Sequence, residues 1–189
     1  MSANLPNMES LVSQCYIKSK EPYLRHFKEY VINAGIDETW DTYVHLHPSK
    51  LWQSNMISFG MMYSRKDDSI LYRDSEYQKL EEGQIYFINL KIIGSILQIP
   101  VMHEMNVVDH SEKIIQSCYL KGGKSEGSQW IRLTPIGENK TLASHETLYK
   151  GDSKIRDKYL YPYFHTRAIN QFHSNIMNAV RNNIKVSQS

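Results

Sequence analysis

Hydrophobic and polar positions alternate most clearly over residues 84–93, where one face carries Tyr86, Ile88, Leu90 and Ile92. An alternation with a period of two is typical of a half-buried strand. Comparable segments lie at 27–34, 97–108, 114–121, 128–135 and 140–150. Because only short turns separate the later segments, the pattern predicts an antiparallel meander of about six strands. Two weaker strand candidates are residues 56–63 and 72–79.

Helical spacing occurs at both ends of the chain and after the first strand. An apolar stripe at i, i+3, i+4, i+7 and i+8 predicts a short helix over residues 8–16, which either packs on the domain or contacts a second subunit. Two small helices are predicted at 36–44 and 49–52. The last helix, over 152–183, would span about 45 Å at 1.5 Å per residue. A helix that long must lie across the sheet.

The order of these elements predicts one α+β domain with a helix-grip arrangement. In this arrangement a curved antiparallel sheet of about six or seven strands wraps around the long C-terminal helix, and a cavity lies between them. We expect residues 1–26 to form a helical appendage and residues 27–186 to form the domain. At 189 residues the chain is long enough for one substantial core.

The long helix carries the most informative candidate residues. With 100° per residue, one face of it presents Phe164, His165, Ala168, Phe172 and Ile176 to the sheet. Pro162 either kinks this helix or marks its true start after a separate short helix, and the sequence leaves both open. His165 is a candidate general acid or base, because imidazole titrates near neutral pH. The alternative is a core histidine that is bonded to a backbone carbonyl.

Composition excludes several classes of partner. The charged fraction is 22% and the net charge is +2, which does not indicate nucleic acid or an anionic membrane as the main partner. We see no signal peptide and no apolar run long enough to span a membrane, so stable membrane insertion is not expected. Two cysteines make no disulfide framework, and a reducing, cytoplasmic location is the simpler interpretation.

From about residue 94 to 180, several segments resemble the START/Bet v 1-like (SRPBCC) superfamily, in particular its bacterial polyketide cyclase/dehydrase and lipid-transport-like group. The resembling segments are 94–100, 105–109, 126–132, the strand with Thr141, and 156–165. The resemblance implies the same helix-grip fold. It also implies a cavity for a lipid, isoprenoid or polyketide-like molecule. Some members cyclise or dehydrate what they bind, so a cyclase or dehydratase is the alternative function.

Strand alternation assigns further side chains to the cavity. If Ile131 faces inward, so does Gln129, and if Met105 faces inward, so does His103 while Glu104 points out. In the strand at 140–150, an inward face that carries the leucines places Glu146 inside and His145 outside. The catalytic candidates are therefore His165 and Glu146. The candidate ligand-binding residues are Trp52, Tyr86, Ile88, His103, Gln129, Phe164, His165 and Phe172.

No motif calls for a metal or a cofactor. The eight histidines include no His-Glu-x-x-His or Cys/His grouping. Gly123-Lys124-Ser125 lacks the preceding glycine of a phosphate-binding loop and is followed by a predicted strand. We therefore expect a hydrophobic small molecule as the only ligand. The N-terminal stripe is also a candidate interface for a homodimer.

Overall fold

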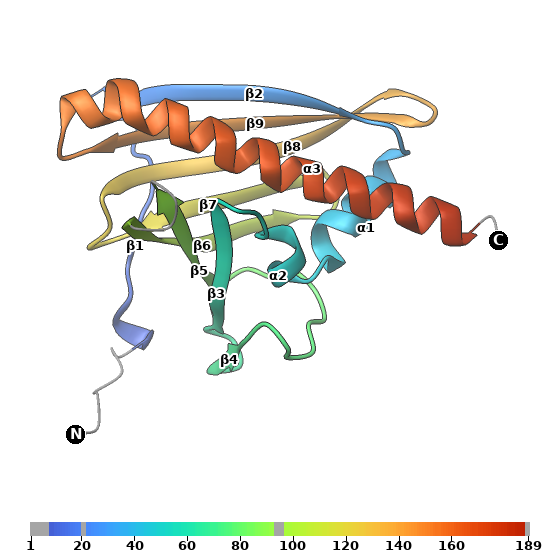
Figure 1. The fold of residues 1–189 in the computed structure, drawn as a ribbon, viewed down its shortest axis with the longest axis horizontal. Coiled ribbons are helices and arrows are strands. Elements are labelled where there is room, and N and C mark those ends of the chain that lie inside the picture. Colours follow the sequence, from blue (N-terminus) through green and yellow to red (C-terminus); the bar gives the residue numbers. More distant parts are fainter. Residues whose placement is uncertain (1–7, 20–21, 93–96, 188–189) are drawn as a thin grey trace.

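Nine antiparallel strands form one sheet around a long helix in the computed structural model, which describes residues 8–19, 22–92 and 97–187 (Figure 1). The strands are β1 (Ser13–Gln14), β2 (Leu24–Ile32), β3 (Ile57–Ser64), β4 (Ser69–Leu71), β5 (Gln84–Ile92), β6 (Leu97–Asp109), β7 (Ile114–Leu120), β8 (Ser125–Gly137) and β9 (Lys140–Gly151). Their order is β2-β9-β8-β7-β6-β5-β3-β4, and β1 pairs with β7. The helical elements are η1 (Met8–Ser10), α1 (Ile36–His45), α2 (Pro48–Leu51), the π-helical turn η2 (Arg156–Leu160) and α3 (Tyr161–Ser187).

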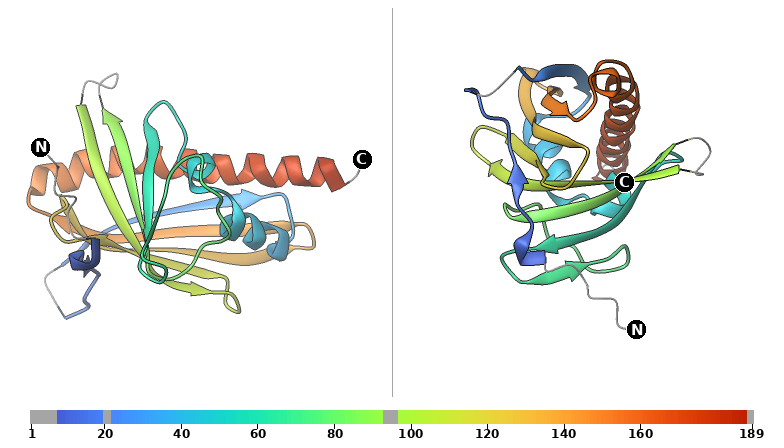
Figure 2. Two further views of the ribbon diagram at one scale, coloured as in Figure 1. Left: turned by 90° about the horizontal axis from the view of Figure 1, so that it is seen from below. Right: turned by 90° about the vertical axis from the view of Figure 1, so that its left-hand side faces the viewer.

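The predicted helix-grip fold is confirmed. Helix α3 lies along the concave side of the sheet, and the end-on view in Figure 2 shows strands curving around it. Its inward face buries Ala168, Phe172, Ile176 and Val180. The first three belong to the predicted stripe, and Val180 extends it by one turn. Burying each large apolar side chain contributes about 1.5–3 kcal/mol. Packing against the sheet therefore holds the helix in place.

Local irregularities accompany the curvature of the sheet. The ladders shift register at Met105/Val107 in β6 and at Pro135/Gly137 in β8, and bulges of this kind bend a strand and increase its twist. Gly127 in β8 has φ +129°, and a Cβ there would lie 2.0 Å from the carbonyl oxygen of Leu148. Only glycine fits this close crossing of β8 and β9.

The helix predicted over residues 8–16 is wrong. One 3₁₀ turn is followed by β1, whose Ser13 and Gln14 pair with Leu120 and Tyr119 of β7. Strand β8 pairs with β7 only as far as Ser128, so the β7 backbone beyond it is available to β1. Met8 and Leu11 pack against a small second core on the convex side, formed by Tyr63, Ile85 and Leu120. The N-terminal stripe thus packs within the chain, and a homodimer remains a prediction.

A disulfide joins Cys15 to Cys118 across 103 residues. The sequence does not predict a bond between these two cysteines, and disulfides persist mainly where conditions are oxidising. A cytoplasmic location remains an untested prediction, and the disulfide argues against it. The bond reinforces an N-terminal segment that polar contacts also hold, since Ser13 Oγ donates to Glu104 Oε2 at 2.6 Å.

Three local expectations differ from the structure or fall outside it. Residues 72–79 contain no strand, and the segment instead brings Tyr77 beside Tyr86 on β5. Pro162 marks the start of the last α-helix, as one of the two interpretations had it, but the short helix before α3 is the π-helical turn η2 and not an α-helix. Pro162 is the second residue of α3, and at the junction with η2 the Tyr161 amide bonds the Arg156 carbonyl in an i→i−5 pattern. The predicted hairpin turn at residues 94–95 lies outside the described residues.

Candidate functional site

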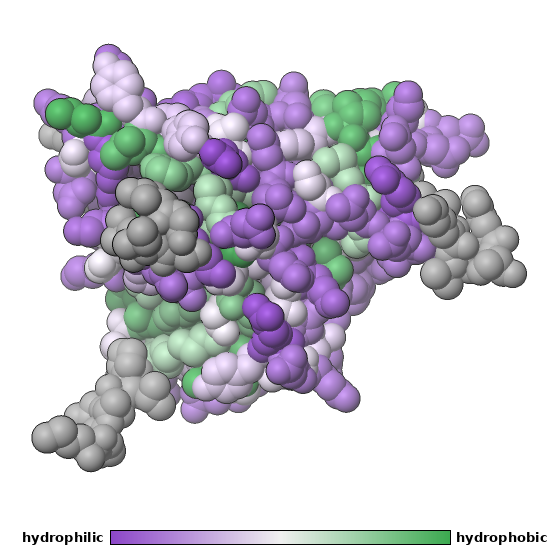
Figure 3. All heavy atoms as spheres, viewed as in Figure 1, coloured by the Kyte–Doolittle hydropathy of each residue, from purple (hydrophilic) through white to green (hydrophobic). Residues whose placement is uncertain are grey.

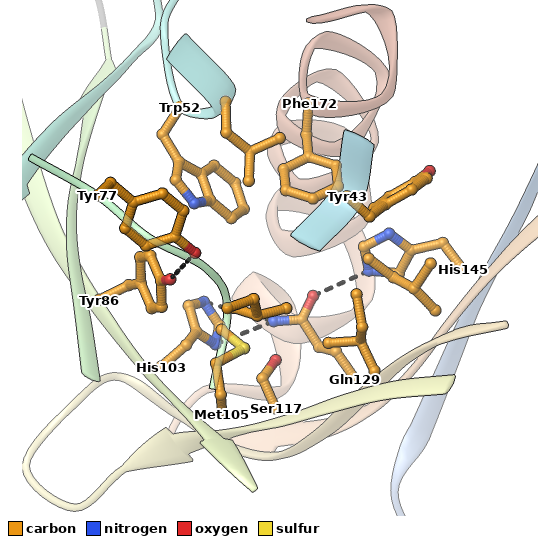
Figure 4. Close-up of a pocket in the computed structure, with 14 residues that line it drawn as sticks. Tyr43, Trp52, Tyr77, Tyr86, His103, Met105, Ser117, Gln129, His145 and Phe172 are labelled. Carbon is orange, nitrogen blue, oxygen red and sulfur yellow. Dashed lines mark hydrogen bonds between the residues drawn. The ribbon is translucent and has the colours of Figure 1, made fainter. Parts of the chain in front are cut away.

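A cavity of about 50 Å³ lies between the sheet, α2 and α3 (Figure 4). Apolar and aromatic side chains supply most of its wall, and a few polar groups gather on one side. The lining residues are Tyr43, Leu51, Trp52, Tyr77, Leu80, Tyr86, His103, Met105, Ile115, Ser117, Gln129, Ile131, His145 and Phe172. Pockets for drug-sized ligands have volumes of about 300–1,000 Å³, so this cavity is smaller than such a pocket.

Aromatic rings form the side of the cavity next to the helices. Trp52, which follows α2, and Phe172 of α3 have ring centroids 4.6 Å apart. Across from them, the hydroxyls of Tyr77 and Tyr86 are 3.2 Å apart, and Tyr86 donates to Gln84 Oε1 at 2.8 Å. Burial raises the pKa of both phenols. These tyrosines therefore stay neutral and offer hydroxyl groups within an apolar wall.

Gln129 is the centre of the polar side. Its Oε1 lies 3.1 Å from His145 Nε2 and 3.1 Å from His165 Nε2, and its Nε2 lies 3.0 Å from His103 Nδ1. The carbonyl oxygen can only accept, so both Nε2 atoms carry hydrogen in this arrangement. The amide in turn donates to His103. Figure 4 shows Gln129 held between His103 and His145.

The hydrogen bonds continue from this centre in two directions. His145 Nδ1 accepts from His173 Nε2 at 2.9 Å, and His173 Nδ1 accepts from the Tyr43 hydroxyl at 2.6 Å. On the other side, His165 Nδ1 lies 3.1 Å from His26 Nδ1. His26, His145, His165 and His173 each have a partner for one accepting and one donating ring nitrogen, which is the pattern of a neutral imidazole. We call His26, His103, His145, His165 and His173, together with Gln129, the histidine network.

Burial keeps the histidine network uncharged. Desolvation lowers the pKa of His103 to about 4. Desolvation, reinforced by neighbouring imidazoles, lowers the pKa of His145 to about 3. Desolvation is also the main cause that lowers the pKa values of His26, His165 and His173. A buried imidazolium would lose its hydration without gaining a carboxylate partner, so the neutral form is favoured.

The structure places five of the eight predicted ligand-binding residues at the cavity. Trp52, Tyr86, His103, Gln129 and Phe172 line it. His165 lies behind Gln129 and reaches the cavity through that amide. Two candidates do not line the cavity. Ile88 is buried in the core, and the ring of Phe164 packs against Tyr163. The binding roles themselves remain predictions.

The inward face assigned to β9 is wrong. His145 is buried and lines the cavity. Glu146 points to the convex side, where its carboxylate lies 2.7 Å from Arg25 and 3.1 Å from Arg132. Its basis as a catalytic candidate is therefore lost. The convex face of β9 is itself partly covered, so it also carries leucines, and apolar character did not distinguish the two faces.

Other lining residues carried only a weak sequence signal. Tyr43 lies on the apolar stripe of α1 with Trp40 and Val44, which predicts burial but not a cavity. Ser117 and Tyr77 come from segments that are far apart in sequence. Among the described residues, no group of three or more His, Cys, Asp or Glu side chains is placed to hold a metal ion.

Comparisons with known proteins define the fold but not the activity. No protein-family model matches the sequence, and no curated protein matches it. A norcoclaurine synthase point mutant from Thalictrum flavum superposes with a TM-score of 0.61 at 13% identity, covering 87% of this chain and 99% of that one. The Panax ginseng major latex-like protein 151 gives a TM-score of 0.58 at 11% identity, with coverages of 84% and 98%.

The chain has the Bet v 1-like helix-grip fold. This confirms the fold that the sequence resemblance implied. A conserved protein from Geobacillus kaustophilus is similar too, with a TM-score of 0.58 at 15% identity over 84% of this chain and 96% of that one. Another Thalictrum flavum norcoclaurine synthase structure, with a TM-score of 0.60 at 14% identity over 84% of this chain and 87% of that one, is a complex with dopamine and hydroxybenzaldehyde. No helix among the described residues is long and apolar enough to cross a membrane.

Proposed function

We propose that this protein binds an uncharged hydrophobic small molecule between the sheet and α3. The observation that carries the proposal is the division of the cavity into an aromatic side, with Trp52 and Phe172, and a polar side at Gln129 and His103. Such a division is typical of small-molecule sites, where apolar area provides affinity and a few polar groups fix orientation. Lipids, isoprenoids and polyketide-like molecules all have this character.

The histidine network favours a ligand with a hydroxyl or carbonyl group. All five imidazoles are held neutral, and among the described residues no carboxylate or cationic side chain lines the cavity. A charged ligand would lose its hydration there without a counter-charge. The Gln129 amide and the His103 ring can instead donate to an uncharged oxygen. A single hydrogen bond of this kind contributes about 0.5–1.5 kcal/mol, which is up to about tenfold in affinity.

Binding requires the cavity to enlarge, because about 50 Å³ holds only a water molecule or two. The wall next to α3 is best suited to move. It includes Trp52 and Phe172, which pack on each other. Helix α3, which carries Phe172, begins directly after the π-helical turn η2, and its second residue, Pro162, has no amide hydrogen to donate. Turns of this type are frequent at functional sites.

A fluorescent dye tests the proposal directly. N-phenyl-1-naphthylamine is uncharged and hydrophobic, and we expect it to bind the wild-type protein with enhanced emission. Ser117→Leu fills the cavity and is expected to weaken binding at least about tenfold through lost space. Ser144→Leu makes the same change on the convex side of β9 and should leave binding unaltered. Equal affinities for the two variants would place the dye elsewhere and contradict the proposal.

The preference for an oxygen-bearing ligand has its own test. We expect 1-naphthol to displace the dye at lower concentration than naphthalene, by up to about tenfold. Gln129→Met keeps the length of the side chain but removes its donors. It should abolish that preference while naphthalene still binds. A wild-type protein that does not distinguish the two compounds would refute the assigned role of Gln129.

An enzyme of the cyclase or dehydratase kind is the second candidate. His103 and His145 line the cavity and are connected to Tyr43 through His173, an arrangement that can pass a proton. However, a pKa of about 4 for His103 makes it a weak base at neutral pH, whereas an efficient general base has a pKa near 7. Binding without chemistry is therefore the better-supported proposal. Turnover of any bound compound that is lost in His103→Gln would favour the enzyme.

A further inference from the structure

Four large apolar side chains are exposed together on the outer side of the turn that begins the C-terminal helix. Ile155 is 73% exposed, Tyr159 61%, Leu160 51% and Tyr163 53%. Figure 3 shows hydrophobic surface at this end of the molecule, above the start of α3 in Figure 1. Single exposed apolar residues are ordinary, but four within nine positions form a patch that calls for a partner. We call these four residues the turn patch.

Cationic side chains surround the turn patch. The Lys158 ammonium lies 5.2 Å from the ring centre of Tyr159, and the Arg167 guanidinium lies 5.6 Å from that of Tyr163. Lys154 precedes Ile155 directly. Among the described residues none of these three cations forms an ion pair.

Acidic groups do not offset these charges. Residues 152–187 contain only two carboxylates, Asp152 and Asp157, and both pair with Arg156. Helix α3 has no acidic residue at all along its 27 positions. The surface at this end of the molecule is therefore apolar at its centre and positive around it.

We propose that the turn patch docks on the surface of a membrane that contains anionic lipid. Tyrosine, leucine and isoleucine side chains insert at the boundary between headgroups and acyl chains, and the surrounding lysines and arginine contact lipid phosphates. The cations stand beside the aromatic rings, which suits an interface where one end of a side chain is apolar and the other is hydrated. The positive charge favours this occupant over a second, equally positive copy of the same surface.

The inner side of the same turn reaches the histidine network. Tyr161, directly after Leu160, stacks on Tyr149 with a centroid distance of 3.5 Å and on His165 at 4.9 Å. Its hydroxyl also bonds the Tyr119 hydroxyl. A membrane that pulls on the turn patch would therefore act on the wall of the cavity. We infer that the bound molecule is exchanged with the membrane at this turn, a step that rests on the proposed ligand binding, whereas docking does not.

Vesicle co-sedimentation tests docking with the full-length protein. We expect binding to phosphatidylcholine vesicles that contain phosphatidylserine, and weaker binding to phosphatidylcholine alone or at high salt. The double variant Tyr159→Ser/Leu160→Ser should lose at least about tenfold in affinity, since it removes two inserted side chains. The control Tyr72→Ser/Ile136→Ser changes residues that are 57% and 49% exposed elsewhere on the surface, and should bind as the wild type does.

The outcomes separate docking from ligand binding. Binding of N-phenyl-1-naphthylamine and the far-ultraviolet circular dichroism spectrum should be unchanged in Tyr159→Ser/Leu160→Ser, which excludes misfolding as the cause. Equal sedimentation of this variant and the wild type would overturn the proposal, as would affinity that does not depend on phosphatidylserine. A dimer in light scattering that only this variant disrupts, without vesicle binding, would assign the turn patch to a second copy and also overturn it.

Discussion

Acid should weaken the fold through the histidine network well before most carboxylates titrate. The folded pKa values of His103 and His145 are about 4 and about 3, whereas an unfolded histidine titrates near 6.5. Below pH 6.5 the unfolded chain therefore binds protons that the folded chain does not. Stability is fully present above that pH and is lost as the pH falls toward the folded values.

The size of the effect follows from the same values. Each ring should lower the free energy of unfolding by about 2 kcal/mol between pH 7.5 and pH 5.0, which is about 4 kcal/mol for the pair. His26, His165 and His173 shift in the same direction and add to the loss. Since a domain of this kind has about 5–15 kcal/mol in total, the loss is a large share of its stability.

Urea denaturation across this pH range measures the effect. His103→Gln retains a polar side chain but cannot take up a proton, so it should remove about 2 kcal/mol of the stability change between pH 7.5 and pH 5.0. His45→Gln makes the same substitution at an exposed histidine on α1, outside the histidine network, and is the matched control. A total change below about 1 kcal/mol between pH 7.5 and 5.0 would refute the reasoning. If His103→Gln showed the same pH dependence as the wild type, His103 would not be one of the rings that cause the loss of stability.

Three further predictions concern the frame of the cavity. Gly127→Ala places a Cβ 2.0 Å from a backbone oxygen and should cost more than about 2 kcal/mol in urea denaturation, whereas Gly122→Ala meets no atom within 4 Å and should cost about 1 kcal/mol. Glu146→Gln should leave dye binding unchanged and lower stability by less than about 1 kcal/mol, since its ion pairs face solvent. Cys15→Ser/Cys118→Ser should lose about 2–4 kcal/mol, and dithiothreitol should reproduce that loss in the wild type alone.

Periodicity in the sequence determined the architecture because each regular element repeats its own pattern. Alternation over residues 84–93 and the apolar stripe through Ala168, Phe172 and Ile176 of the last helix require burial on one side only. A strand meander followed by one long helix has few ways to bury the apolar face of the sheet and the apolar face of the helix together. The inward positions of Gln129 and His103 followed from the same period of two.

Tertiary structure alone decided which polar groups meet. The choice between His145 and Glu146 depends on which face of β9 covers the core, and the convex face is also partly covered, so apolar character alone could not resolve it. The Cys15–Cys118 bond and the pairing of β1 with β7 join residues about a hundred positions apart, and no local pattern encodes such a distance. The histidine network draws its rings from β2, β6, β9 and α3, and only folding connects them to one amide, three directly and two through a neighbouring imidazole.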